Sequence, residues 1–172
     1  MKLPYQGHFF NADTLYKRFT PAGPDHAQVA ACAGMADYIE ALYAHHFAGA
    51  AQNASAVQRG AAVHDLMRSA EEALLQPLLD YLAARNDLRL LGSRRAADRA
   101  PTVAIALDRA AEPVAQALAS HGVMAGGGDF YAVRPLRAMG IDLDRGVLRM
   151  SFVHYTTKSE VDQLIRALDQ VL

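Results

Sequence analysis

Apolar residues recur at helical spacing in three stretches of the chain, and each stretch predicts a long helix. The first is expected over residues 25–46, where the opening aspartate is suited to cap the helix. The second is expected over residues 60–85, with leucines on one face and a kink or break at Pro77. The third follows Thr157 and Glu160, which have the spacing of a capping box.

The second half of the chain also contains runs with the period of two that is typical of strands. Strands are expected over residues 88–91, 102–107 and 147–153. In the last run, Leu148 and Met150 face one side of the strand and Arg149 faces the other. This alternation predicts a strand that buries one of its faces in a core.

Glycines separate the remaining short elements. Helices are predicted over residues 112–120 and between Val133 and Gly140, and the three glycines at 126–128 are expected to form a loop between them. Consecutive glycine N–H groups can bind phosphate, but neither a dinucleotide fingerprint nor a Walker loop is present. A flexible connection is therefore the favoured interpretation.

This order of elements predicts an α+β fold, a helix–sheet sandwich in which helices cover a small, mainly antiparallel sheet. We expect an N-terminal arm over residues 1–24 and one α+β domain over residues 25–172. Within that domain, residues 25–85 would form the two long helices and residues 86–172 the sheet-and-helix unit.

Composition excludes several classes of protein. The 172 residues carry a formal net charge of −1, so no basic surface is expected for nucleic acid or an anionic membrane. A single cysteine excludes a disulfide framework and a cysteine-rich zinc site. Neither a spanning apolar run nor the apolar start of a signal peptide is present, which predicts a cytoplasmic protein.

The residues that usually bind metals give little support for a metal site. No two histidines have the spacing of four that a helical zinc site needs, so no metal is expected. Cys32 falls on the apolar face of the first predicted helix. We interpret it as a small core residue rather than a nucleophile, which would need positive surroundings.

Arg149 is the most informative single residue, because an arginine in a half-buried strand needs a carboxylate partner or a bound anion. Spacing alone favours a structural pair with Asp129 or Asp142. Thr20 precedes Pro21, and its hydroxyl could bind phosphate or make a hydrogen bond within a turn. The turn is favoured from spacing alone.

The last 27 residues, 146–172, resemble the C-terminal signature of class V aminotransferases, the family that includes the cysteine desulfurases. Thr156 stands where asparagine is usual. The matching positions are Arg149, Ser151, Tyr155 and Thr157.

Two upstream stretches support this resemblance. Residues 128–132, Gly-Asp-Phe-Tyr-Ala, look like the loop near the family's active site, and Thr20-Pro21 looks like its Gly-Thr-Pro segment. The resemblance spans nearly the whole chain and is closest to the cysteine desulfurase-like branch. It implies the C-terminal domain of a fold-type I enzyme that depends on pyridoxal phosphate (PLP).

The resemblance implies a role for three residues. Arg149 would bind the α-carboxylate of an amino-acid substrate, and Thr20 would reach the cofactor phosphate of a partner subunit in a homodimer. Tyr131 would lie at the substrate, where the desulfurases carry their persulfide-forming cysteine, so desulfurase chemistry through a loop thiolate is not expected. No residue of this chain is expected to be catalytic.

The lysines do not fit the chemistry that the family performs. PLP enzymes need a lysine for the Schiff base, and none of the segments around Lys2, Lys17 and Lys158 resembles that site. We expect the family's large domain, with its lysine, to precede Met1, and PLP to bind the complete enzyme but not this chain alone. The alternative is a non-enzymatic, truncated module that binds a carboxylate ligand or a protein partner.

Overall fold

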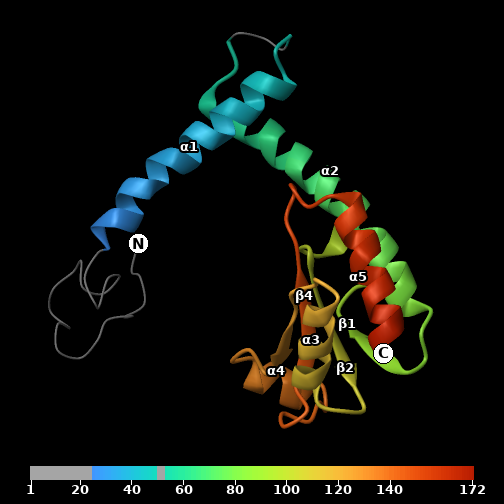
Figure 1. Ribbon diagram of the computed structural model, residues 1–172. Coiled ribbons are helices and arrows are strands. Elements are labelled where there is room, and N and C mark those ends of the chain that lie inside the picture. Colours follow the sequence, from blue (N-terminus) through green and yellow to red (C-terminus); the bar gives the residue numbers. More distant parts are fainter. Residues whose placement is uncertain (1–24, 50–52) are drawn as a thin grey trace, which may run out of the picture. The chain divides into compact units, whose positions relative to one another are not determined.

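The computed structural model describes residues 25–49 and 53–172. The arm expected over residues 1–24, and Thr20 with it, lies outside the described residues. No helix in these two ranges has the length and apolar character needed to cross a membrane. The elements, in chain order (Figure 1), are α1 (His26–His46), α2 (Ala56–Ala83), β1 (Leu88–Leu91), the short 3-10 helix η3 (Ala96–Asp98), β2 (Thr102–Leu107), α3 (Ala111–Ser120), β3 (Gly126–Gly128), α4 (Val133–Ala138), β4 (Val147–Ser151) and α5 (Lys158–Val171).

The chain divides into two units at a point inside α2, with Val63 ending the first and His64 beginning the second. The first unit contains α1, whose predicted cap is confirmed: the Asp25 carboxylate accepts hydrogen bonds from two backbone N–H groups of the first turn. None of the residues of α1 is buried. Cys32 is exposed, so its interpretation as a core residue is wrong. The apolar residues of α1 are exposed or only partly buried, so they form no core around this thiol.

Of the kink or break predicted at Pro77, the break does not occur, because α2 continues through this residue. Proline lacks an N–H and costs the helix one backbone hydrogen bond. The side chains around it offset that cost, because Leu75, Leu78 and Leu79 are all buried. α2 also begins four residues earlier than the pattern predicts, at Ala56.

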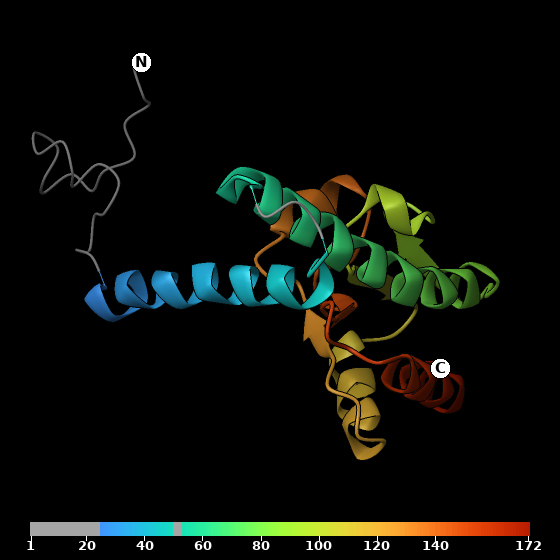
Figure 2. The ribbon, with the colours of Figure 1, turned by 90° about the horizontal axis from the view of Figure 1, so that it is seen from above.

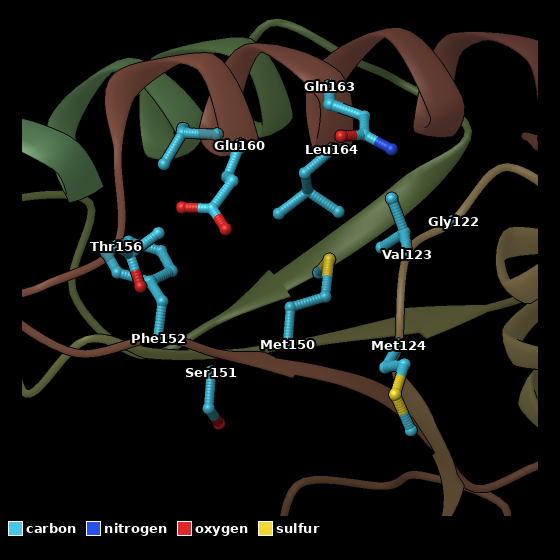
Figure 3. Close-up of a pocket in the computed structure, with 11 residues that line it drawn as sticks. Gly122, Val123, Met124, Met150, Ser151, Phe152, Thr156, Glu160, Gln163 and Leu164 are labelled. Carbon is cyan, nitrogen blue, oxygen red and sulfur yellow. The ribbon is translucent and has the colours of Figure 1, made fainter.

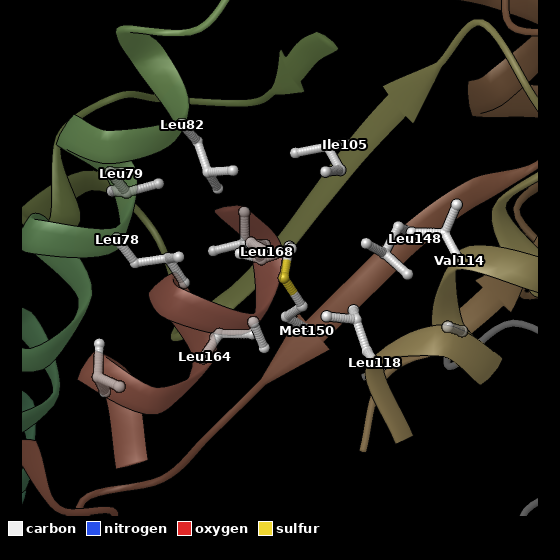
Figure 4. Close-up of a cluster of buried hydrophobic side chains, with 14 of the residues drawn as sticks. Leu78, Leu79, Leu82, Ile105, Val114, Leu118, Leu148, Met150, Leu164 and Leu168 are labelled. Carbon is white, nitrogen blue, oxygen red and sulfur yellow. The ribbon is translucent and has the colours of Figure 1, made fainter. Parts of the chain in front are cut away.

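The second unit is built on a four-stranded sheet in the order β1-β2-β4-β3, with every neighbouring pair antiparallel. The predicted α+β class is therefore confirmed. α2, α3 and α5 pack on one face of the sheet, while α4 lies on the other, and Figure 2 shows α3 and α4 on opposite sides. The main core lies between the sheet and the helices α2, α3 and α5 (Figure 4). It includes Leu78, Leu82, Ile105, Leu118, Leu148 and Leu168.

The predicted loop over residues 126–128 is wrong, because these glycines form β3 and pair with β4. Their extended backbone also differs from the conformation of a phosphate-binding nest. A Cβ atom added at Gly127 would lie 2.4 Å from the backbone nitrogen of Glu112, in the first turn of α3. Glycine is therefore required where α3 packs directly on the strand.

α5 begins with the predicted capping box, which the structure confirms. The Glu160 backbone N–H donates to Thr157 Oγ1 at 3.3 Å, and the Thr157 N–H donates to Glu160 Oε2 at 2.7 Å. The Thr157 N–H, together with the Thr157 hydroxyl that donates to Glu160 Oε2 at 2.8 Å, holds the pKa of Glu160 below its usual range. The box fixes the start of α5 soon after β4, the strand that holds Arg149.

Candidate functional site

Arg149 lies in the middle of β4, on the face of the sheet away from the main core. Its partners in the neighbouring strands are Ala104 of β2 and Gly126 of β3. Side chains directly opposite in a sheet are close neighbours, so these two small residues leave room above them. The Arg149 side chain is exposed.

The guanidinium of Arg149 stacks on the ring of Phe130, with 3.9 Å between Cζ and the ring centroid. This is a cation–π contact at close range. The ring in turn lies against Gly126, where an added Cβ atom would be 2.9 Å from Phe130 Cζ. Three residues from two strands and a turn are thus stacked on one another.

The turn that carries Phe130 has an unusual backbone. Phe130 and Tyr131 have φ values of 51° and 59°, the left-handed region that glycine and asparagine favour. The turn is closed by the Ala132 N–H, which donates to the Asp129 carbonyl at 2.8 Å. Asp129 Oδ1 also accepts a hydrogen bond from the Tyr131 N–H at 3.0 Å. Each bulky left-handed residue costs about 1–2 kcal/mol, so the packing around the turn must offset this strain.

Tyr131, the predicted substrate residue, is fully exposed at the tip of this turn. Phe130 and Tyr131 therefore have different surroundings: one ring packs on the sheet beside Arg149, and the other extends into solvent. The structure places Tyr131 next in sequence to the residue that contacts Arg149, but records no contact between Tyr131 and Arg149 themselves.

The structural ion pair that spacing alone favours for Arg149 does not occur among residues 25–49 and 53–172. The Asp129 side chain bonds within its own turn. Asp142 lies 3.6 Å from Arg145 and accepts a hydrogen bond from the Asp144 N–H. No carboxylate of the described chain forms an ion pair with Arg149, so its hydrogen-bonding edge is available to an anion from outside.

A pocket of about 260 Å³ opens on the other side of β4, between the loop after α3 and the first turns of α5 (Figure 3). Its wall includes Met150 and Leu164, while Arg149 and Tyr131 do not line it. Two of its polar side chains already have partners: Glu160 belongs to the capping box, and Gln163 donates to the His121 carbonyl at 2.9 Å. The pocket is thus separate from the predicted site.

The described residues do not fit PLP by themselves. Lys158 is the only lysine among them, and its Nζ lies 2.6 Å from Asp162 Oδ2 on the surface of α5. A Schiff-base lysine needs an amine that is free to react and surrounded by a cofactor site. Thr20, the predicted phosphate contact, falls outside the described residues. The described chain also holds no group of acidic, histidine or cysteine side chains that could bind a metal.

Sequence reasoning identified Arg149 and its face of the strand but missed Phe130. The Gly-Asp-Phe-Tyr-Ala stretch resembles an active-site loop, yet nothing in the residue pattern distinguishes the stacked ring of Phe130 from the exposed ring of Tyr131. The only local signal was Gly126, whose missing side chain makes room for an aromatic ring four residues later.

The chain is similar to known proteins over most of its length. The family model described as aminotransferase class V matches residues 27–164. The aminotransferase-like protein FGM3 of Gibberella zeae is 34% identical over 113 residues, which cover 63% of this chain and 28% of that protein.

Solved structures of cysteine desulfurases share the fold. CsdA of Escherichia coli aligns with a TM-score of 0.51 and 27% identity, over 71% of this chain and 31% of that one. The cysteine desulfurase of Thermococcus onnurineus NA1 aligns with a TM-score of 0.55 and 20% identity, over 67% and 30% of the two chains. This chain thus spans less than a third of the length of each of these relatives.

Proposed function

Because the chain belongs to the class V aminotransferase family, we propose that it serves as the C-terminal domain of a PLP-dependent enzyme, aminotransferase or cysteine desulfurase-like. In this role it binds the carboxylate of an amino-acid substrate and contributes to a dimer interface. It does not provide the Schiff-base lysine, so the chain alone is inactive. PLP, when bound in the complete enzyme, supplies the electron sink for chemistry at the substrate α-carbon.

The observation that carries this proposal is the state of Arg149. Arg149 is exposed on the face of β4 away from the main core and lacks a carboxylate partner in the described chain, although the strand beneath it is part of the core. A guanidinium binds a carboxylate through two parallel hydrogen bonds, which fix the orientation of the ligand as well as its position. Arg149 would hold the α-carboxylate and so determine which way the rest of the substrate points.

Other residues complete the proposed site. Tyr131 extends into solvent from the turn beside Arg149 and would contact the substrate. Thr20 would contact the cofactor phosphate of a partner subunit, in a cytoplasmic homodimer that binds neither nucleic acid nor membrane. The exposed apolar residues of α1, Val29 and Met35, are consistent with a surface that another chain covers.

A second candidate function is a non-enzymatic module that binds a carboxylate ligand or a protein partner. The surface ion pair of Lys158 favours it, because no lysine of the described chain is placed for cofactor chemistry. Both candidates assign the same anion-binding role to Arg149.

We expect L-alanine to bind the chain at Arg149, with a dissociation constant on the order of 10–100 mM. One charge-assisted contact contributes about 1.5–3 kcal/mol, which is less than a millimolar site requires. The Nε–Hε signal of Arg149, followed by NMR at constant ionic strength, should shift and saturate with L-alanine but not with L-alaninamide, which lacks the carboxylate.

The replacement Arg149→Gln should abolish saturable binding of L-alanine at this face. Arg137→Gln is the matched control, because Arg137 is an exposed arginine of α4 in the same unit and should leave the titration unchanged. Equal shifts with L-alanine and L-alaninamide, or no shift at Arg149, would contradict the proposal.

Treatment with equimolar PLP followed by borohydride should leave no stoichiometric adduct on the purified chain. Reduction traps any Schiff base as a mass increase, and Lys158 is held in an exposed ion pair instead of a cofactor site. Intact-protein mass spectrometry checks this. One cofactor per chain, mapped to a single lysine, would contradict the proposal that this chain does not provide the Schiff-base lysine.

A further inference from the structure

We infer that Phe130 is a positioning residue for Arg149: its ring holds the guanidinium against the sheet with the hydrogen-bonding edge turned outward. This inference rests on the proposed carboxylate-binding role of Arg149. The ring is partly buried and also packs against the small cluster of Leu91, Leu136, Ile141 and Val147. The inference assigns it a role beside Arg149 in addition to this packing.

Gly126 determines where the Phe130 ring can lie. Phe130 lies over Gly126, the cross-strand partner of Arg149, and a Cβ atom at that position would approach Phe130 Cζ to 2.9 Å. Real Cβ atoms do not come so close, so the ring can occupy this place only above glycine. The missing side chain of Gly126 therefore leaves space for the ring directly beside Arg149.

The backbone of the turn that places the Phe130 ring is strained. A turn with two left-handed central residues normally uses asparagine or glycine, but here the positions hold Phe130 and Tyr131. The hydrogen bond from the Tyr131 N–H to Asp129 Oδ1 helps to hold the conformation. Strain of this kind persists where the surroundings maintain it, and it is concentrated at functional sites.

The stack also limits the freedom of Arg149 before any ligand binds. Ala104 and Gly126 flank the side chain and are too small to fix it. Of the side chains in residues 25–49 and 53–172, only the Phe130 ring stacks on the guanidinium. A side chain that is already ordered loses less conformational entropy on binding, and a covered face leaves the planar edge for a bidentate carboxylate.

The test replaces the ring while keeping the turn. In Phe130→Leu the left-handed residue is still bulky, so the backbone strain is similar, but the aromatic ring current disappears. We expect the Arg149 Nε–Hε signal of the free protein to move downfield and the affinity for L-alanine to fall about two- to fivefold, as expected for loss of an exposed cation–π contact.

A second variant tests the contact between Phe130 and Arg149 by changing the glycine beneath the ring. Gly126→Ala keeps the ring but displaces it, so it should change the Arg149 signal and weaken L-alanine binding in the same direction as Phe130→Leu. Tyr155→Leu is the matched control. It also removes an aromatic ring, in this case one that follows β4 and contacts His154 instead of Arg149, so signal and affinity should stay unchanged.

The two proposals fail in different ways. A native chain whose Arg149 signal does not respond to L-alanine would overturn the carboxylate-binding role and the positioning role together. A normal native response that both Phe130→Leu and Gly126→Ala leave unchanged would overturn the positioning role alone.

Discussion

Replacing Gly127 by alanine should destabilise the sheet-and-helix unit by about 3 kcal/mol, at the upper end of the range for overpacked sites. The added Cβ atom would lie 2.4 Å from the Glu112 nitrogen and 2.5 Å from the Ala111 carbonyl carbon. Both are backbone atoms of the first turn of α3, so no side-chain rotation can relieve the clash. α3 would have to move away from β3 and from the core that it covers.

The measurement is the free energy of unfolding from urea denaturation, followed by far-ultraviolet circular dichroism. Gly60→Ala is the control: it makes the same chemical change in α2, where nothing lies within 4 Å of the added atom. It should not destabilise the chain, because alanine is favoured over glycine inside a helix. Equal effects of the two substitutions would show that α3 does not pack on Gly127.

The same contact explains why the run of three glycines could not be interpreted correctly from sequence. Strands such as β2 and β4 follow from local alternation, and the capping box before α5 follows from the spacing of two residues. β3 has no side chains and so no alternation. Residues 126–128 form a strand because they pair with β4 and because the backbone of α3 packs on Gly127. The three glycines themselves carry no sign of either contact.

Two further errors have the same physical origin. The pattern predicts a kink or break at Pro77 because proline disfavours a helix locally, but α2 does not break there, since burial of the leucines around Pro77 outweighs that preference. Cys32 was assigned to a core because it lies on an apolar stripe, yet the described part of α1 buries none of its residues. Periodicity shows that a face is apolar; it does not show what covers that face.

For the candidate site, too, the sequence predicts the strand and its orientation but not the contacts between distant residues. Alternation in β4 placed Arg149 opposite Leu148 and Met150, and the structure agrees, with both apolar side chains buried and the arginine exposed. An ion pair of Arg149 with Asp129 or Asp142 depends on the geometry of two turns, and residue spacing does not specify that geometry. The Phe130 stack depends on left-handed residues that no propensity favours, and so it was visible only in three dimensions.

Replacing Leu148 by alanine should destabilise the same unit by about 3–4 kcal/mol. Leu148 is fully buried in the centre of the sheet, where it packs near Val114 and Leu118 of α3 (Figure 4). Removing a buried leucine costs about 2–5 kcal/mol, more where the cavity cannot collapse. Collapse is restricted here because one cross-strand neighbour is Gly127, which has no side chain to move into the space.

Met124→Ala is the control for this substitution, since it also shortens a large apolar side chain, but one that is 95% exposed. It should change the free energy of unfolding by less than about 0.5 kcal/mol, as surface substitutions usually do. Urea denaturation of both variants gives the comparison. If Leu148→Ala were as mild as Met124→Ala, the face of β4 opposite Arg149 would not be the core, and the outward orientation of the arginine, on which carboxylate binding depends, would have no structural basis.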